Sequence, residues 1–453
     1  MKEQDLKDGF RRILEKNKSR AALSKSYAFD SVDLSESRAS NIGMEALVAR
    51  DEEHSWQRQL RPSFGKQGVN RSEIGGHPDF NHLAGTDGVE FHHACALFLD
   101  IKNSTRLALL YELKDVIWIK NSILKAASEI VRSLDGHVHR FMGDALLAFF
   151  GRKGVKMEDS VVNAINCVSV LESLMVKTII PVLVDEGYEA KDLGFRIGLD
   201  YGDDKKIAWS SYGYNEVKEV TATSFYVDVA SKLQGMAKKN NCMMGESVLS
   251  SIDFPDAFVR KKKVIDGGQV VEVDCLDRTY TDRSGNVIRY KVRELSKDAY
   301  RDLLPFGAEL KAQFEGSSCV GHHGAKFQCY VNPSNSPVEY ASISRSLPKG
   351  TPLEFKLTLA GGAFGLNLFP LKISFTKRNH GAEAQLHKSA GVFPVSDQSV
   401  PPESEVGRGQ FFMGKVIKFP ESTAYRGLHT MEAVVKDRLG NLLFKDCIGV
   451  YID

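Results

Sequence analysis

The segment HVHRFMGDALLAFFG, residues 137–151, is the starting point for the fold, because it reads as two strands joined by a tight turn at Gly143–Asp144. Upstream, Cys95 to Leu99 form a continuous apolar run that ends in Asp100, as expected of a strand buried on both faces. Two acidic residues therefore stand where buried strands end. An acid in such a place costs free energy unless it holds a cation or accepts hydrogen bonds.

Helices are predicted on either side of the hairpin. Between the first strand and the hairpin, apolar residues recur at helical spacing: Leu110, Leu113, Ile117, Leu124, Ala127, Val131 and Leu134. A second amphipathic helix is predicted over 161–184. FRIGLDYG (195–202) is a further strand, and 217–238 contain a strand that leads into a helix. This order predicts an α+β layer with helices covering one face of an antiparallel sheet.

The flanking regions differ in texture from this layer. Residues 1–90 predict an irregular N-terminal extension, although Leu6, Phe10 and Leu14 share one helical face and leave a short docking helix open beside a frayed terminus. From about Tyr300, short alternating segments such as PLEFKLTLA and CIGVYID predict a small β-sandwich. We therefore expect three parts: 1–90, 91–298 with its core at 91–255, and 299–453.

Bulk properties narrow the class of protein. The 453 residues hold 60 Lys and Arg against 58 Asp and Glu, and this balance argues against nucleic-acid binding, which usually requires a basic excess. We find no run of about 18 apolar residues and no secretory signal, so no membrane segment is predicted. The seven cysteines are scattered, which favours a reducing cytoplasm.

Asp100 and Asp144 predict a metal site. If the hairpin pairs beside the first strand, both carboxylates converge at one end of the sheet, where they could hold two Mg²⁺ or Mn²⁺ ions. The short turn after Asp100, with Asn103, Ser104 and Thr105, could bind phosphate through backbone N–H groups. The alternative is that each Asp only stabilises the turn in which it lies, a common role for Asp in hairpins.

Four motifs carry a resemblance to a known family. FLDIKNST, RFMGDALLAFFG, FRIGLDYG and YVDVASKL occur in the order found in class III adenylate and guanylate cyclases. The resemblance covers 91–255 and implies a ferredoxin-like βαββαβ core in a head-to-tail homodimer. It also implies that Asp100 and Asp144, helped by the Ile101 carbonyl, bind two divalent metals. The implied reaction is attack of the ribose 3′-hydroxyl on the α-phosphate.

Four positions depart from the purine cyclases that the motifs resemble. Arg140 stands where they carry the base-reading Lys, and Thr221 where they carry an Asp. Asp228 replaces the Asn that orients the ribose, and Lys232 replaces the Arg that stabilises the pentavalent phosphate. Lys is a point charge without the guanidinium fork, so it offers less geometric control. A degenerate pseudo-cyclase is one reading; because both metal-binding Asp residues are intact, we favour a cyclase retuned to another base.

The replaced residues point to a pyrimidine. Arg140 donates only, and Thr221 both donates and accepts, which suits uracil best and orders the substrates UTP, CTP, ATP. The layout of the whole chain also resembles the pyrimidine cyclases of bacterial Pycsar anti-phage systems, in which a β-rich sensor domain follows the cyclase. That resemblance implies synthesis of cyclic UMP or cyclic CMP on infection, read by a separate effector protein.

Three other functions compete with this interpretation. One is a conventional adenylate cyclase. A second is a catalytically silent nucleotide-sensing scaffold whose β-domain does the binding. A diguanylate cyclase shares the sheet architecture, but the chain lacks a GGDEF-type hairpin.

Overall fold

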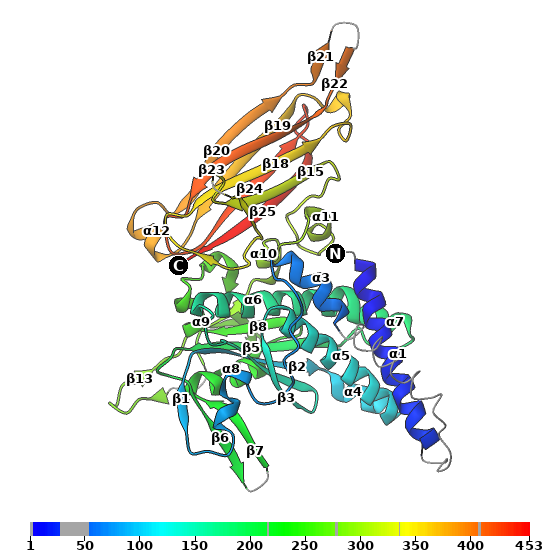
Figure 1. The fold of residues 1–453 in the computed structure, drawn as a ribbon, viewed down its shortest axis with the longest axis vertical. Helices are drawn as coiled ribbons and strands as arrows, with labels where there is room; N and C mark the ends of the chain where they lie inside the picture. The colour runs from blue at the N-terminus through cyan, green and yellow to red at the C-terminus, as the bar shows by residue number, and fades with distance from the viewer. Residues whose placement is uncertain (1–2, 28–53, 215–216, 277–279, 335, 406–408) are drawn as a thin grey trace.

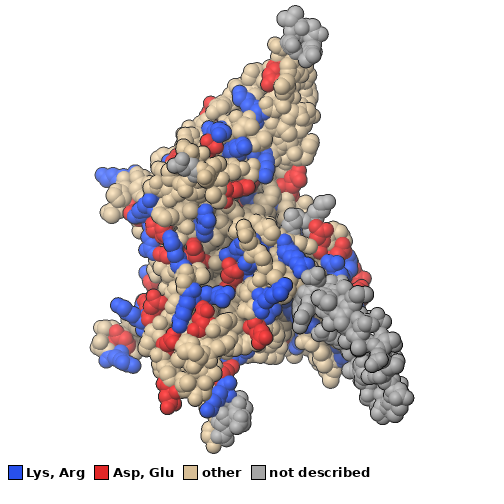
Figure 2. Space-filling view, in the orientation of Figure 1, with Lys and Arg blue, Asp and Glu red and all other residues tan. Residues whose placement is uncertain are grey.

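The computed structural model describes residues 3–27, 54–214, 217–276, 280–334, 336–405 and 409–453. A layered α+β body holds the described residues up to about 300, and an elongated β-structure, yellow to red in Figure 1, extends from it. On the face shown in Figure 2, Lys and Arg are interspersed with Asp and Glu.

A seven-stranded sheet, in the order β3-β4-β2-β5-β8-β14-β9, forms the centre of the body. The strands are β2 (Ala94–Lys102), β3 (His137–Met142), β4 (Ala145–Phe150), β5 (Gly194–Gly202), β8 (Asn241–Gly245), β9 (Val259–Arg260) and β14 (Val292–Leu295). Helices α4 (Ser104–Leu110) and α5 (Leu113–Ser133) follow β2, and α6 (Met157–Leu174) follows β4. The antiparallel order β3-β4-β2-β5 is that of a ferredoxin-like βαββαβ unit, so the predicted fold is confirmed.

Helices cover both faces of this sheet, which corrects the prediction of a single covered face. Cys95, Leu97 and Leu99 share a core cluster with residues of α5 and α6, whereas Ala94 and Ala96 pack with residues of α8 (Phe225–Met236). The two sets alternate along β2, as the continuous apolar run requires. Gly198 of β5 lets α8 approach, because a Cβ there would lie 2.1 Å from the Ala230 carbonyl oxygen.

Two N-terminal helices pack against α5. They are α1 (Glu3–Tyr27) and α3 (Ser55–Ser63), and their rings Phe10 and Trp56 are both buried, with centroids 6.4 Å apart. The expectation of an irregular segment over 1–90 is therefore wrong for these helices, and the docking-helix alternative holds for α1. Residues 28–53 of that segment lie outside the described residues.

A small three-stranded sheet, β1-β6-β7, projects from the body as an arm (Figure 1). Its strands are β1 (Val89–Phe91), β6 (Ala208–Tyr214) and β7 (Val217–Thr223). Trp209 of β6 is fully buried and stacks on Phe80, with ring centroids 4.4 Å apart. This packing fixes the arm to the body, and β7 is left as an edge strand.

The C-terminal part is a β-sandwich, as predicted. One sheet, β16-β15-β18-β23, faces another, β17-β25-β24-β19-β20, across a shared apolar core. The strands are β15 (Ala325–Val331), β16 (Val338–Tyr340), β17 (Ser346–Leu347), β18 (Pro352–Ala360), β19 (Leu371–Asn379), β20 (Gly391–Val400), β23 (Gly414–Ser422), β24 (Gly427–Lys436) and β25 (Leu442–Ile452). A cavity of about 580 Å³ opens between the sheets, beside Lys377, Glu421 and Tyr425.

The remaining elements are short. They are η1 (Pro78–Leu83), η2 (Met175–Ile179), α7 (Ile180–Asp185), α9 (Glu246–Ser251), η3 (Asp256–Phe258), β10 (Lys262–Asp266), β11 (Gln269–Val273), β12 (Tyr280–Thr281), β13 (Val287–Ile288), α10 (Lys297–Arg301), α11 (Ala308–Lys311), η4 (Leu366–Leu368), α12 (Ala382–Leu386), β21 (Glu403–Glu405) and β22 (Gly409–Phe411).

One helical stretch bears on the prediction that nothing is apolar enough to span a membrane. Met157–Asp185 is long and apolar enough by length and composition, so that prediction missed it. In the structure, 72% of its most apolar window is buried inside the protein. Contacts of α6 with β2, β4 and β5 are those of a core helix.

Candidate functional site

The two acidic residues singled out by the sequence lie at the ends of neighbouring strands. Asp100 of β2 is directly opposite Ala145 of β4, and Asp144 immediately precedes that residue in the hairpin turn. The Ile101 backbone N–H donates to the Asp144 carbonyl oxygen at 3.2 Å. Gly143 has φ +67°, a left-handed conformation that the two-residue turn requires and that glycine adopts without strain.

Each carboxylate has a cationic neighbour within the chain. Arg196 of β5 lies directly opposite Asp100. Its Nε donates to Asp100 Oδ2 at 2.9 Å, and its Nη2 donates to the same oxygen. Asp144 Oδ2 accepts from the Ser104 hydroxyl and lies 3.6 Å from Lys120 Nζ of α5. The side chains of Asp100 and Asp144 are 14% and 28% exposed, so both are accessible from outside.

The donor set fits a divalent cation. All of these contacts fall on Oδ2, and the Oδ1 atoms of Asp100 and Asp144 accept no hydrogen bond from any residue that the structure describes. Carboxylate oxygens are the ligands that Mg²⁺ and Mn²⁺ prefer. Two such oxygens on adjacent strand ends, with a backbone segment at Ile101 beside them, could share a metal centre.

The three residues of the predicted phosphate-binding turn, Asn103, Ser104 and Thr105, have different environments. Asn103 has φ 65°, and its side-chain amide donates to the Asp192 carbonyl oxygen at 2.9 Å, so it braces a neighbouring loop. Ser104 is buried and bonds Asp144 instead. Thr105 is exposed. A phosphate-binding role for these three residues stays a prediction.

The two predicted base-reading residues meet within one chain. Arg140 Nη2 of β3 lies 3.4 Å from Thr221 Oγ1 of β7. Thr221 Oγ1 also lies 2.9 Å from His139 Nε2, and Arg140 Nη2 lies 2.5 Å from Glu219 Oε1. A charged and polar cluster of four side chains therefore joins β3 to the arm.

Asp228 and Lys232 lie one turn apart on α8 and are both exposed. Ser224 caps the start of α8, because its hydroxyl oxygen accepts a hydrogen bond from the Tyr226 backbone N–H. Within the described residues, neither side chain forms a hydrogen bond or ion pair with Asp100 or Asp144. Lys232 Nζ instead lies 5.4 Å from the centre of the Tyr280 ring.

Sequence reasoning missed Arg196, Lys120 and Glu219. Arg196 had a signal, because it is the one basic residue of FRIGLDYG and alternates with the buried residues Phe195 and Ile197. Its pairing with Asp100 depends on the register of strands far apart in the sequence. Glu219 lies two residues before Thr221 and therefore on the same face of β7, a relation that the sequence also contains.

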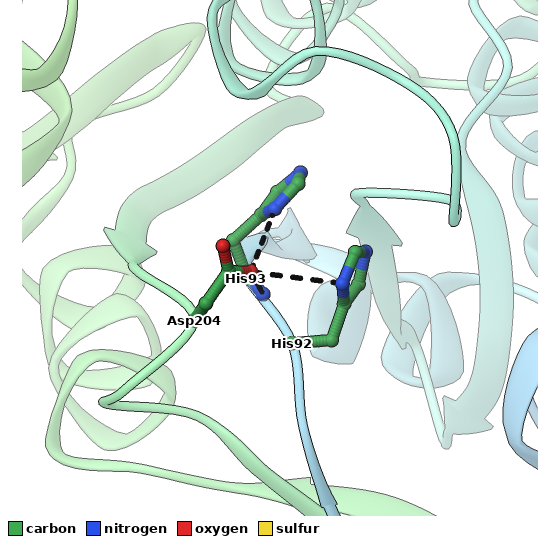
Figure 3. Close-up of side chains that lie close together, drawn as sticks. All are labelled: His92, His93 and Asp204. Atoms are coloured by element: carbon green, nitrogen blue, oxygen red, sulfur yellow. Dashed lines mark hydrogen bonds and ion pairs between the residues drawn. The ribbon is translucent and has the colours of Figure 1, made fainter.

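A second cluster lies near the opposite end of β2, where His92, His93 and Asp204 converge (Figure 3). Asp204 Oδ1 accepts from the His93 backbone N–H at 2.7 Å and lies 3.0 Å from His93 Nδ1. Burial lowers the pKa of His92, which keeps its ring neutral. These bonds tie the turn after β5 to the start of β2, which accounts for the cluster as a structural contact.

Comparisons with known proteins find relatives of the chain. Residues 309–453 match the family described as Adenylyl/Guanylyl and SMODS C-terminal sensor domain. A cytidylate cyclase of Escherichia coli is 38% identical over 404 residues, 88% of each chain. One of Staphylococcus aureus is 32% identical over 402 residues, 87% of each chain. Among solved structures, the adenylyl cyclase CyaB from P. aeruginosa covers 46% of this chain and 95% of its own, at 18% identity and a TM-score of 0.37.

Proposed function

Because the chain belongs to the family of nucleotidyl cyclases that includes the bacterial cytidylate cyclases, we propose that it converts a pyrimidine nucleoside triphosphate to the 3′,5′-cyclic monophosphate and pyrophosphate. CTP is the first candidate substrate and UTP the second. Arg140 and Thr221 alone had placed UTP first, but the relatives, all cytidylate cyclases, do not support that order.

The observation that carries the proposal is the position of Asp100 and Asp144 at neighbouring strand ends, each with one carboxylate oxygen that accepts no hydrogen bond from the described residues. We propose that these oxygens, with the Ile101 carbonyl, hold two Mn²⁺ or Mg²⁺ ions. Bound there, the ions would supply acidity to the attacking hydroxyl and charge neutralisation to the leaving pyrophosphate. Ser104 and Arg196 keep the carboxylates in place through their Oδ2 atoms.

The other residues have proposed roles in positioning the substrate. Arg140 and Thr221 contact the base, and Asp228 and Lys232 orient the ribose and offset charge at the α-phosphate. The 3′-oxygen attacks the α-phosphorus, and the bond to pyrophosphate breaks. A lysine at position 232 can offset this charge but cannot form the forked contact of an arginine.

A homodimer would bring the two sets of residues together. Asp228 and Lys232 are exposed on α8. Helices α4 and α5, which bring Ser104 and Lys120 to Asp144, expose four large apolar side chains: Leu109, Leu110, Leu113 and Ile117. An exposed apolar patch beside a site is the mark of an interaction surface. In a two-fold symmetric dimer this surface supports two equivalent sites.

A competition assay tests the function. We expect the purified protein with Mn²⁺ to turn CTP, offered together with UTP, ATP and GTP, into a cyclic product identified by mass. Asp144→Ala should abolish turnover and leave the fold intact. Asp282→Ala, which changes an exposed Asp in the β12–β13 hairpin turn, is the matched control. Turnover by Asp144→Ala would refute the metal assignment.

The same assay separates the rival functions. Preference for ATP would identify a conventional adenylate cyclase. Nucleotide binding without pyrophosphate release, in the presence of Mn²⁺, would favour a catalytically silent scaffold.

We further propose that the product is a cytoplasmic second messenger in anti-phage defence, read by a separate effector. The match of 309–453 to a sensor-domain family supports a regulated cyclase. Cells that carry the gene should accumulate the cyclic pyrimidine nucleotide after phage infection, and cells with Asp144→Ala should not. Equal nucleotide levels before and after infection would contradict the role.

A further inference from the structure

We propose that Glu219 is a base-reading residue, the acceptor that recognises the exocyclic amine of cytosine and so selects CTP over UTP. The inference rests on the proposed cyclase function and adds to it a residue that neither the motifs nor the relatives assign. It is carried by the ion pair between Glu219 and Arg140 and by the two edge strands from which they come.

Glu219 and Thr221 share one face of β7. They lie opposite Tyr212 and Ser210 of β6, two residues apart, and side chains two apart on a strand point the same way. Strand β7 is the edge of the arm sheet, and β3 is the edge of the central sheet. The face that carries Thr221, a predicted base contact, therefore presents Glu219 toward the same space.

A β-bulge directs Arg140 into that space. The register of β3 with β4 shifts between Val138 and Arg140, so His139 is the extra residue. Bulges redirect side chains and are frequent next to active sites. Arg140 Nη2 reaches to 2.5 Å from Glu219 Oε1, and the two side chains are 35% and 39% exposed. A small molecule can therefore reach the pair.

The pair keeps hydrogen-bonding capacity for a ligand. Among the described residues, Glu219 Oε2 accepts no hydrogen bond, and Arg140 Nη1 donates none. His139 is buried, and burial lowers the pKa of its ring, which stays neutral. Its Nε2 lies 2.9 Å from Thr221 Oγ1 and fixes that hydroxyl beside the pair.

The combined pattern of donors and acceptors matches cytosine. Cytosine presents one donor, the N4 amine, and two acceptors, N3 and O2. Glu219 Oε2 offers an acceptor, and Arg140 Nη1, which carries two N–H groups, offers two donors. Guanine likewise offers one acceptor and two donors when it pairs with cytosine.

Uracil does not match. Its O4 acceptor would face an acceptor oxygen of Glu219, and two acceptors that lose water without gaining a hydrogen bond disfavour binding. Arg140 and Thr221 considered alone could not exclude uracil. The added carboxylate is what reverses the order to CTP before UTP.

Replacing the carboxylate by an amide tests the assignment. Glu219→Gln can donate a hydrogen bond to uracil O4, so we expect the ratio of kcat/KM for CTP over UTP to fall by about tenfold or more. Glu219→Asp keeps the acceptor and should keep the preference for CTP at a lower rate. Glu354→Gln is the matched control, because Glu354 of β18 forms an ion pair at 3.0 Å with Lys418 of β23 in the β-sandwich. It should leave the CTP-to-UTP ratio unchanged.

The outcomes separate this inference from the proposed function. Cyclic product from the parent protein with an unchanged CTP-to-UTP ratio in folded Glu219→Gln would overturn the assignment of Glu219 alone. Parent protein that prefers UTP or ATP, or a folded Glu219→Asp that prefers UTP, would also overturn it. If no triphosphate is turned over, the proposed function fails. In that case the dissociation constants of the α,β-methylene analogues of CTP and UTP are measured for the parent protein and for Glu219→Gln. An unchanged CTP-to-UTP ratio of these constants would overturn the role of Glu219.

Discussion

Asp100 of β2 forms an ion pair with Arg196, the residue opposite it on β5. With the guanidinium removed, a carboxylate that is only 14% exposed loses its hydrogen bonds. We expect Arg196→Met to lower the free energy of unfolding by about 1–3 kcal/mol without divalent ions, and Mn²⁺ to restore much of it. Urea unfolding with and without Mn²⁺ measures both effects.

The control for this change is Arg106→Met. Arg106 pairs with Asp192 and Glu189 on the surface, where ion pairs contribute about 0–1 kcal/mol. An Arg196→Met protein as stable as the parent in the absence of Mn²⁺ would show that Arg196 does not hold Asp100.

Glu172 of α6 is a buried carboxyl whose two oxygens have no hydrogen-bond partner among the described residues. Burial raises its pKa from the ordinary 4.5 to about 8, although Lys297 and Arg301 act in the opposite direction. The folded protein therefore keeps a proton that the unfolded chain releases above about pH 4.5. Its contribution to stability is full below that pH and falls by about 1.4 kcal/mol per pH unit up to about pH 8.

Glu172→Gln removes this titration. We expect the variant to lose less stability than the parent between pH 5 and pH 8, measured by urea unfolding at several pH values. Parallel profiles for the two proteins would mean that Glu172 is ionised in the folded state.

Helices α4 and α5 present the apolar surface that we assign to the dimer. Leu113 and Ile117 are 70% and 57% exposed. A charge on each should repel an apolar partner, so Leu113→Glu with Ile117→Glu is expected to give a monomer that has lost turnover. Sedimentation and the CTP assay measure the two properties together. Leu386→Glu, an exposed leucine of α12, is the control, and a fully active monomer would contradict a shared site.

The sequence predicts the strand and helix order well because the patterns are local. The apolar run before Asp100 and the Gly143–Asp144 turn each define their element within a few residues. The side of the sheet that α8 covers was not predictable, since periodicity marks an apolar face without saying what it packs against. The contacts of Arg196 and Glu219 were not predicted for a related reason. Each residue meets its partner only because strands that are distant in the sequence pair or pack together.

The core of the cyclase body extends into the base of the β-sandwich, which also has an apolar core of its own. Ile343, Leu428 and Tyr451 of the C-terminal part belong to the same buried cluster as the helices of the body. The Tyr300 hydroxyl donates to Asn166 Oδ1 at 2.8 Å and lies 3.1 Å from the Tyr451 hydroxyl. Asn166 in turn donates to the Ile343 carbonyl oxygen at 2.7 Å. Such a buried, satisfied network joins the two parts as one cooperative unit.

This continuity predicts a single unfolding transition in calorimetry. Tyr451→Ala, which removes a fully buried ring, should destabilise the whole chain by about 3–5 kcal/mol and lower the temperature at which cyclase activity is lost. Tyr451→Phe keeps the ring and removes one hydroxyl, so we expect a loss nearer 1 kcal/mol. If the sandwich instead unfolded separately, Tyr451→Ala would shift one of two transitions and spare the activity. The sandwich would then have to influence the active site through surface contacts such as the bond from Arg426 to the Ser251 carbonyl, and not through the core.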